Sequence, residues 1–335
     1  MSGDAYAKAG VDQGAADSAV AALVRALGAI ELERPSAQVP LPGHYASVIR
    51  VGENLGIALS TDGVGTKLLI AERLGRLDTV GIDCVAMNVN DVICVGAEPL
   101  AMLDYVAIDR ANVEACEQIG IGLARGATLA GIEIPGGELA QLGEMVHGVD
   151  VSGACFGTVA LDAIVDGSAV APGDVVVGLP SSGLHSNGYT LARSALDGLD
   201  YGEDPEGRLG RPLGEALLEP TEIYVKPIVE LLRSPVAVHG LAHITSGGTE
   251  NLLRLAAEVG YEIDAPLPVP PIFELIREHG NVSDSEMHEV FNMGCGFCVV
   301  VPASDEAAAL ELLRAHYPPA AGIGRVVAGP RAVHR

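Results

Sequence analysis

The chain has 335 residues, of which 49% are hydrophobic and 19% charged, and its formal net charge is −24. This length and composition predict a globular protein with a large core, and we expect two domains, residues 1–168 and 169–335. The negative charge argues against nucleic acid as a partner, because nucleic-acid phosphates would be repelled. No apolar run reaches the roughly 18 residues of a membrane-spanning helix, and the first residues lack the pattern of a signal peptide. We therefore expect a cytoplasmic protein with no membrane contact.

Hydrophobic patterns predict mixed secondary structure in both halves. The first half should contain, in order, a hairpin, a helix, a strand, a helix and two strands, at residues 47–61, 79–95, 99–108, 113–130, 132–138 and 151–162. A turn at 172–174 should open the second half. Its strands are expected at 175–179, 291–301 and 323–328, and its helices at 187–199, 222–232, 250–257 and 305–315. Because strands and helices mix without strict βαβ alternation, the pattern favours an α/β (α+β) fold with antiparallel sheet over a Rossmann domain.

The junction Ser-Thr-Asp-Gly-Val-Gly-Thr-Lys at residues 60–67 joins a predicted strand to a predicted helix. It contains a carboxylate, two glycines, a hydroxyl and a cation, which are Asp62, Gly63, Gly65, Thr66 and Lys67. The glycines allow a ligand to approach the unpaired N–H groups at a helix start. This is not a Walker A loop, in which Lys precedes Ser or Thr. The junction is therefore either an ordinary capped turn or a site for a metal-bound polyphosphate.

The helix predicted at 79–95 carries a polar stripe. Asp83, Met87, Asn90 and Asp91 share one face of an otherwise apolar helix. An unpaired buried carboxylate would cost several kcal/mol, so Asp91 should meet a cation, a metal or a network of donors. The alternative is a stripe that faces solvent.

Gly136-Gly137-Glu138 repeats the combination of glycine and carboxylate after a strand. Together with Asp62 and Asp91, Glu138 would form an oxygen cage suited to Mg²⁺, which prefers oxygen ligands and is usually shared with phosphates. Each of these acids taken alone is more often a surface residue.

Two further junctions are rich in hydroxyls, at residues 181–189 and 243–249. Hydroxyls, an amide and a histidine at a helix start suit an anion or a ribose. Helix capping by Ser186 or Asn187 is an alternative that is compatible with ligand binding. Cys295 and Cys298 have CxxC spacing, but no second pair completes a zinc site, so we expect neither metal nor redox use.

Taken in order, these segments closely resemble the phosphoribosylformylglycinamidine cyclo-ligases, or aminoimidazole ribonucleotide synthetases, of purine synthesis. The resemblance covers nearly the whole chain, through residues 6–12, 60–67, 89–91 with 96–99, 136–138 with Met145, 181–189, 243–248 and 291–294. It implies two α/β domains, the first pairing across a homodimer to close a shared β-barrel and the second a sheet packed with helices. It also implies an ATP-dependent ligase that converts formylglycinamidine ribonucleotide to 5-aminoimidazole ribonucleotide, ADP and phosphate.

The resemblance assigns expected roles to individual residues. Mg²⁺ would be held by Asp62, Asp91 and Glu138, and K⁺ is a possible further ion. The catalytic candidates are Lys67 as a phosphate clamp, His185 and Asp91. ATP would contact Asp62, Gly63, Gly65, Thr66, Lys67, Asn90, Asp91, Gly137 and Glu138. The ribonucleotide would contact Ser182, His185, Ser186, Asn187, Thr245, Gly247 and Gly248.

One segment departs from the family pattern. Many members carry a Gly-Gly-Phe-Gly-like loop before the first hairpin, whereas residues 40–45 here read Pro-Leu-Pro-Gly-His-Tyr. How the N-terminal segment covers the substrate is therefore left open.

Relatives with this architecture catalyse other reactions. Selenophosphate synthetase needs a reactive cysteine near the N-terminus, and the first cysteine here is Cys84. The hydrogenase-maturation relative uses a C-terminal cysteine, which the last residues lack. Formylglycinamidine synthetase is the nearest alternative and thiamine-phosphate kinase a more distant one. The alternative that is not an enzyme is a catalytically silent protein that binds nucleotide and keeps the fold as a scaffold.

Overall fold

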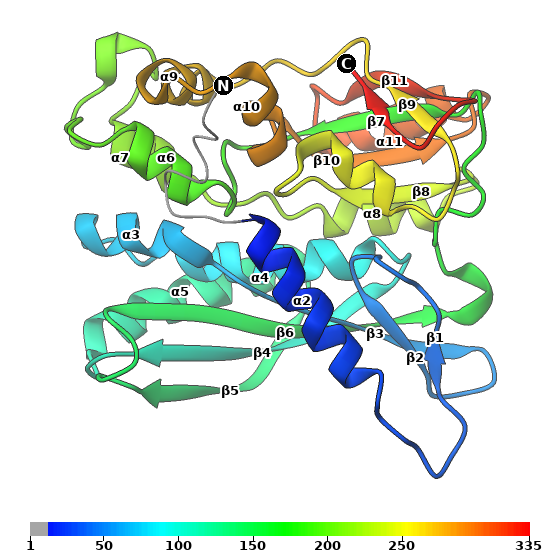
Figure 1. Ribbon diagram of the computed structural model, residues 1–335, viewed down its shortest axis with the longest axis horizontal. Helices are drawn as coiled ribbons and strands as arrows, with labels where there is room; N and C mark the ends of the chain where they lie inside the picture. The colour runs from blue at the N-terminus through cyan, green and yellow to red at the C-terminus, as the bar shows by residue number, and fades with distance from the viewer. Residues whose placement is uncertain (1–12) are drawn as a thin grey trace.

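The computed structural model describes residues 13–335 and has a mixed α/β fold of two domains (Figure 1). The resemblance at residues 6–12 lies outside the described residues. One six-stranded sheet belongs to each half of the chain, the first ending at Ala160 and the second beginning at Val175. The chain therefore passes from one sheet to the other between these residues, which bracket the predicted boundary at 168.

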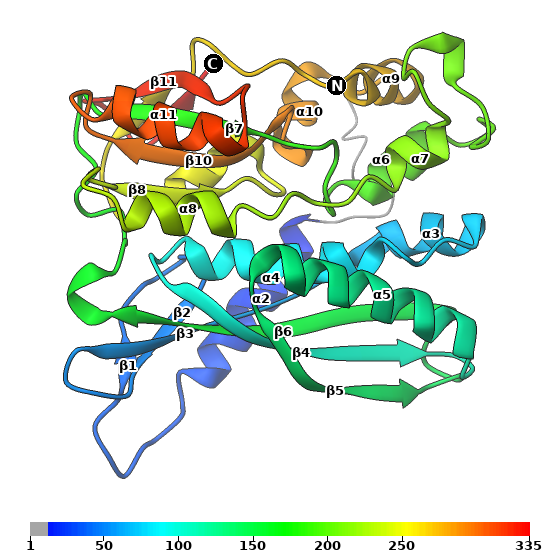
Figure 2. The same ribbon diagram turned by 180° about the vertical axis from the view of Figure 1, so that it is seen from behind.

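The N-terminal sheet has the strand order β1-β2-β3-β6-β4-β5. Its strands are β1 (Gln38–Val39), β2 (Ser47–Arg50), β3 (Leu55–Gly63), β4 (Glu98–Ile108), β5 (Glu133–Gln141) and β6 (Val149–Ala160). All neighbours are antiparallel except β4 and β5. The helices of this half are α2 (Gln13–Leu27), α3 (Leu68–Leu74), α4 (Val80–Ile93) and α5 (Val113–Ala130), with the 3₁₀ turn η1 (Gly65–Lys67) before α3. Helices α4 and α5 lie on one face of the sheet (Figures 1 and 2).

The C-terminal sheet has the order β12-β9-β11-β7-β10-β8 and is antiparallel except where β12 meets β9. Its strands are β7 (Val175–Pro180), β8 (Gly240–His243), β9 (Gly260–Glu262), β10 (Cys295–Val301), β11 (Ala321–Val327) and β12 (Val333–His334). The helices are α6 (Tyr189–Ala195), α7 (Leu213–Leu217), α8 (Val225–Leu232), α9 (Pro271–Gly280), α10 (Asp284–Val290) and α11 (Glu306–His316). Short 3₁₀ segments are η2 (Leu161–Ala163), η3 (Pro205–Gly207) and η4 (Gly248–Arg254).

A side-chain cap and a glycine fix the two ends of helix α5. The side chain of Asn112 caps α5 by accepting the Ala115 N–H at 3.2 Å, and Gly131 ends the helix with a left-handed φ of 74°. The predicted helix at 113–130 is confirmed. The segment predicted as a helix at 250–257 is instead the 3₁₀ segment η4, and α9 and α10 were not predicted.

Helix α4 is the buried centre of the molecule. It lies between the N-terminal sheet and the C-terminal domain, where α8 packs above it (Figures 1 and 2). Every residue of α4 except Asp91 is buried. Its polar stripe therefore faces the second domain, and the solvent-facing alternative is wrong. Across residues 13–335, no helix has both the length and the apolar character needed to cross a bilayer.

Candidate active site

The end of β3 is fixed to α4 by Asn88, a residue that the sequence did not single out. The Asn88 side chain accepts the Asp62 N–H at 3.0 Å and donates to the Asp62 carbonyl at 3.1 Å and the Cys84 carbonyl at 2.8 Å. The Gly63 N–H donates to the Asp62 carboxylate at 2.7 Å. Strand β3 therefore presents Asp62 in a defined position beside α4.

Asp62 and Asp91 form a close acidic pair at the interface of the two domains. Burial raises the pKa of Asp62, and the charge of Asp91 raises it further, while the Gly63 N–H and nearby His243 and Arg254 oppose the shift. Two neighbouring carboxylates, one of which disfavours the ionisation of the other, are suited to share a cation. The donor chemistry of this pair fits Mg²⁺.

Asp91 meets the network of donors that the sequence predicted for it. Its Oδ1 lies 2.9 Å from Nδ1 of His243 on β8, and Ser60 Oγ donates to its Oδ2 at 3.3 Å. His243 is fully buried, and its Nε2 has no hydrogen-bond partner among residues 13–335. This contact joins a motif of the N-terminal half to one of the C-terminal half.

Glu138 does not join this acidic pair within one chain. The registers align Asp62 with Gly153, Gly153 with Asp104 and Asp104 with Gly137, so Glu138 lies on the opposite sheet face from Asp62. Three strand spacings also separate the two strands, which is about 14 Å. Within the described part of the chain, no group of three His, Cys, Asp or Glu residues is placed to hold a metal.

Lys67 lies at the domain interface, where its ammonium is enclosed by protein acceptors. Nζ lies 2.9 Å from both carboxylate oxygens of Asp83 and donates to the carbonyls of His185 at 3.1 Å and Glu219 at 2.6 Å. Burial lowers the pKa of Lys67, while the charge and hydrogen bond of Asp83 raise it in opposition. An ammonium has three N–H donors, so this arrangement leaves none for the predicted phosphate contact.

The loop between β7 and α6 contains four of the predicted substrate residues. Ser182 Oγ donates to the Pro220 carbonyl at 2.6 Å, and Ser186 Oγ lies 3.1 Å from Thr221 Oγ1. Asn187 Nδ2 is buried without a partner among the described residues, and its Oδ1 lies 3.4 Å from Ser246 Oγ. Asn187 therefore has an unused donor.

His185 is fully buried and has a left-handed backbone, with φ of 63°. Its Nε2 accepts the Ser182 N–H at 3.3 Å, and burial lowers its pKa well below the usual value, assisted by His243 and Lys67. The ring is thus neutral and shapes its own loop. Its Nδ1 is buried without a partner among the described residues, so the ring keeps one donor for a ligand, and the predicted role in substrate orientation or proton transfer stays a prediction.

The junction at residues 243–249 requires its glycines. Gly247 has φ of 98° and Gly248 φ of 53°, and a Cβ on Gly248 would lie 2.3 Å from the His288 carbonyl oxygen. The Thr245 N–H donates to Asn251 Oδ1 at 2.7 Å. The predicted residues Thr245, Gly247 and Gly248 therefore form a tightly constrained turn beside His243.

The loop at residues 40–45, whose sequence departs from the family pattern, packs against η4, the segment that follows this turn. Tyr45 OH donates to the Asn251 carbonyl at 3.1 Å, and the Arg254 guanidinium lies 4.8 Å from the centre of the Tyr45 ring. Neither ring nitrogen of His44 has a partner among the described residues. Burial lowers the pKa of His44 to about 4, although Asp166 and Asp91 act in the opposite direction. The loop thus lies close enough to Asp91 for the charge of that carboxylate to act on His44 and Tyr45.

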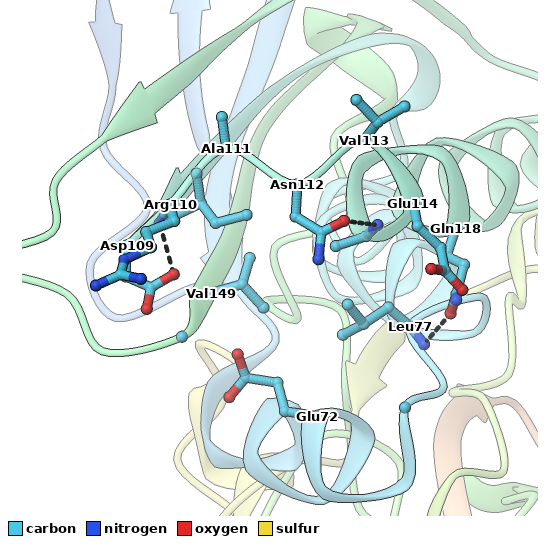
Figure 3. Close-up of a pocket in the computed structure, with 14 residues that line it drawn as sticks. Glu72, Leu77, Asp109, Arg110, Ala111, Asn112, Val113, Glu114, Gln118 and Val149 are labelled. Atoms are coloured by element: carbon cyan, nitrogen blue, oxygen red, sulfur yellow. Dashed lines mark hydrogen bonds between the residues drawn. The ribbon is translucent and has the colours of Figure 1, made fainter.

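A hollow of about 760 Å³ lies away from these residues (Figure 3). It is lined from α3, the end of β4 and the start of α5, and none of the predicted site residues lines it. Figure 3 shows that Asn112 and Gln118 use their side-chain oxygens on backbone N–H groups, those of Ala115 and Leu77. The candidate site is therefore the domain interface.

The paired cysteines are reduced. Cys295 and Cys298 have their sulfurs 3.6 Å apart on β10, and both are buried. A hydrogen bond from Cys295, followed by burial, raises the pKa of Cys298 well above its usual value. These buried thiols are poor nucleophiles.

Comparison with known proteins matches both halves of the chain. Residues 43–159 match the family model described as AIR synthase related protein, N-terminal domain, and residues 171–335 match its C-terminal domain. A phosphoribosylformylglycinamidine cyclo-ligase from Pyrococcus furiosus is 48% identical, over 93% of this chain and 92% of the relative. The one from Methanothermobacter thermautotrophicus is 51% identical over 82% of each. A solved structure, AaThiL complexed with AMPPCP and TMP, has a TM-score of 0.63 and 19% identity over 88% of each chain, which indicates a shared fold.

Proposed function

The chain belongs to the AIR synthase family of phosphoribosylformylglycinamidine cyclo-ligases, and from that membership we propose how its domain interface closes an imidazole ring. The reaction converts formylglycinamidine ribonucleotide and ATP to 5-aminoimidazole ribonucleotide, ADP and phosphate. One observation carries the proposal: the Asp91–His243 contact brings the acidic motif of the first domain to the glycine-rich motif of the second. Nucleotide and ribonucleotide can therefore meet at this interface.

The chemistry requires activation of a poor leaving group. The formyl amide oxygen cannot depart as oxide, so the γ-phosphoryl group is transferred to it. The internal amidine nitrogen then attacks the activated carbon, and the C–O bond breaks as phosphate leaves. In such a transfer the protein contributes mainly positioning and charge stabilisation.

The ATP phosphates are assigned to the end of β3 and the start of η1. Asp62 and Asp91 would hold Mg²⁺, with Asn90 as a supporting residue. The backbone at Gly63, Gly65 and Thr66 would approach the phosphates. When bound, Mg²⁺ offsets the phosphate charge. The raised pKa of Asp62 beside Asp91 supports this assignment, and AaThiL, a protein of the same fold, was solved with AMPPCP.

A second copy of the chain would complete the site. The sheet face opposite α4 and α5 carries Leu59, Leu103 and Tyr105, which are 40%, 48% and 40% exposed. Packing two such faces together would bury this apolar surface and close a shared barrel. Glu138 lies on the same face, paired with Tyr105. In this homodimer, Gly137 and Glu138 of one subunit would contribute to the nucleotide site of the other.

The ribonucleotide is assigned to the two constrained turns of the second domain. Asn187 has an unused donor there. The other assigned residues are Ser182, His185, Ser186, Thr245, Gly247 and Gly248. A requirement for K⁺ and a cytoplasmic location belong to the same proposal.

Coupled product analysis tests the proposed function. The purified protein is incubated with ATP and Mg²⁺, with and without formylglycinamidine ribonucleotide. ADP release should depend on the ribonucleotide and match the aminoimidazole product one to one. ATP binding without substrate-dependent turnover would support a nucleotide-binding scaffold instead.

A further inference from the structure

Lys67 and Asp83 form a buried ion pair whose remaining contacts all reach the second domain. Both side chains have no exposed surface. The carbonyls of His185 and Glu219 accept from Lys67 Nζ, and Asp83 Oδ1 accepts the N–H and the hydroxyl of Thr221, both at 2.7 Å. A buried pair of this kind requires complete hydrogen bonding, because each charge loses its hydration. The second domain supplies two hydrogen bonds to Asp83 Oδ1 and two of those of Lys67 Nζ, whereas Asp83 Oδ2 meets only Lys67.

The contacts of the pair converge on two neighbouring segments, the loop 181–187 and the segment 219–221. These segments are also bonded to each other, through Ser182 to Pro220 and through Ser186 to Thr221. Lys67 contacts both segments directly, and Asp83 contacts the second. The pair therefore fixes the loop relative to η1 and α4 of the first domain.

The loop is held in a conformation that it would not adopt alone. His185 has φ of 63°, a region that residues other than glycine rarely occupy. Such a conformation persists where the surroundings determine it. The His185 carbonyl accepts from Lys67 and its ring accepts from the Ser182 N–H. One contact to the backbone and one to the ring of the same residue thus maintain the left-handed turn.

We propose that Lys67 and Asp83 are positioning residues, which hold the substrate loop 181–187 in its strained conformation against the first domain. This inference rests on the proposed function, which assigns the ribonucleotide to that loop. Lys67 then acts on the ribonucleotide through His185 and has no contact with the ATP phosphates.

Steady-state kinetics separate this role from a phosphate clamp. We expect Lys67→Met, Asp83→Asn and Thr221→Val each to lower kcat/KM for the ribonucleotide, by on the order of 10²-fold for the Lys67 and Asp83 variants, since small misplacements have effects of this size. KM for ATP should stay close to that of the wild type. Thr221→Ser keeps the hydroxyl and should recover most of the activity that Thr221→Val loses. If Lys67 were a phosphate clamp, Lys67→Met would instead raise KM for ATP. Asp83→Asn and the Thr221 variants would then leave kcat/KM for the ribonucleotide unchanged.

Amide hydrogen exchange supplies a readout that does not require turnover. Residues 181–187 and 219–221 should exchange faster in Asp83→Asn and Thr221→Val than in the wild type, whereas Thr221→Ser should match the wild type. Unchanged exchange in these segments would overturn the inference, even if Lys67→Met fails to fold. If the wild type shows no ribonucleotide-dependent ADP release, the proposed function fails, and the exchange result still decides whether the pair positions the loop.

Discussion

Asp62 is the residue whose surroundings most directly suggest a ligand. Burial and the charge of Asp91 raise its pKa, so the ionised carboxylate is held here at a cost in stability. Asp62→Asn should lower turnover by on the order of 10²–10³-fold, as for the loss of one group that stabilises charge in a transition state. The variant should be at least as stable as the wild type, because the amide oxygen can still accept the Gly63 N–H.

Turnover assays and thermal unfolding without nucleotide check this prediction. Ser18→Ala, on the exposed helix α2, is a suitable control, because it should change neither turnover nor stability appreciably. Unchanged turnover in Asp62→Asn would remove this residue from the nucleotide site. A large loss of stability would show that the carboxylate is structural.

His44 should give the protein a defined pH dependence. Its folded pKa of about 4 lies below the ordinary 6.5, so the unfolded chain binds more protons between these values. Stability should therefore fall as pH falls from about 6.5 to about 4, with a contribution from His44 on the order of 2–3 kcal/mol. Urea unfolding at pH 7 and pH 5 should show a smaller loss in His44→Gln than in the wild type. An identical loss in both proteins would contradict the assigned burial of the ring.

At this scale the sequence predicted residue types better than residue roles. A carboxylate on this helix was expected to meet a cation, a metal or a network of donors, and Asp91, which is mostly covered, contacts His243 and Ser60. Lys67 was placed in the site, but the sequence could not reveal that Asp83, sixteen residues later, would engage its ammonium. The contacts of Asn88 with Asp62 and of His243 with Asp91 were not predicted, although His243 lies in the junction 243–249, because these partners are distant in sequence.

Helices α4 and α5 pack closely because glycines face each other at their crossing. A Cβ on Gly122 would lie 2.8 Å from the Asp78 carbonyl oxygen and 2.9 Å from the Gly81 backbone nitrogen, whereas one on Gly120 would meet nothing within 4 Å. Gly122→Ala should therefore lower the free energy of unfolding by roughly 1–3 kcal/mol through overpacking.

Gly120→Ala, on the same helix, is the matched control. It should leave stability unchanged or raise it by up to about 1 kcal/mol, since alanine is the better helix former. Chemical denaturation of both variants compares them directly. Equal effects at the two positions would mean that the helices do not touch through Gly122.

Element prediction succeeded where the periodicity was strong and local caps were present. Helix α5 has both an Asn cap and a terminal glycine, so its bounds could be predicted. Helix α10 has a capping box between Ser283 and Glu286, a local signal that could have located it. Segment η4 could not be predicted as 3₁₀, because its conformation depends on the turn at Gly247 and Gly248 against His288.

At the scale of the whole molecule, the exposed apolar sheet face is the surface that the proposed homodimer would bury. Leu103→Glu places a charge on that face and should convert the proposed homodimer to a monomer. Val113→Glu is the control, because Val113 is 86% exposed at the start of α5. Sedimentation velocity at micromolar concentration measures the outcome. A monomeric wild type, or a Leu103→Glu variant that remains dimeric, would contradict this assembly.

The two-domain architecture could be predicted from strand and helix patterns, but the closeness of the domains could not. The interface is made by α4, which reads in sequence as an apolar helix with a few polar residues. Only the fold shows that Asp83, Asn90 and Asp91 all reach the second domain, where Asn90 bonds the backbone of Glu222 and Tyr224. The convergence of separate motifs is a property of tertiary packing.

Transfer of oxygen from substrate to phosphate tests the central claim most directly. Formylglycinamidine ribonucleotide labelled with ¹⁸O in the formyl group is converted with ATP and Mg²⁺, and the released phosphate is analysed by mass spectrometry. Our account predicts one ¹⁸O atom in each phosphate and one imidazole product for each ADP. Unlabelled phosphate, or ADP formed without the imidazole, would contradict it.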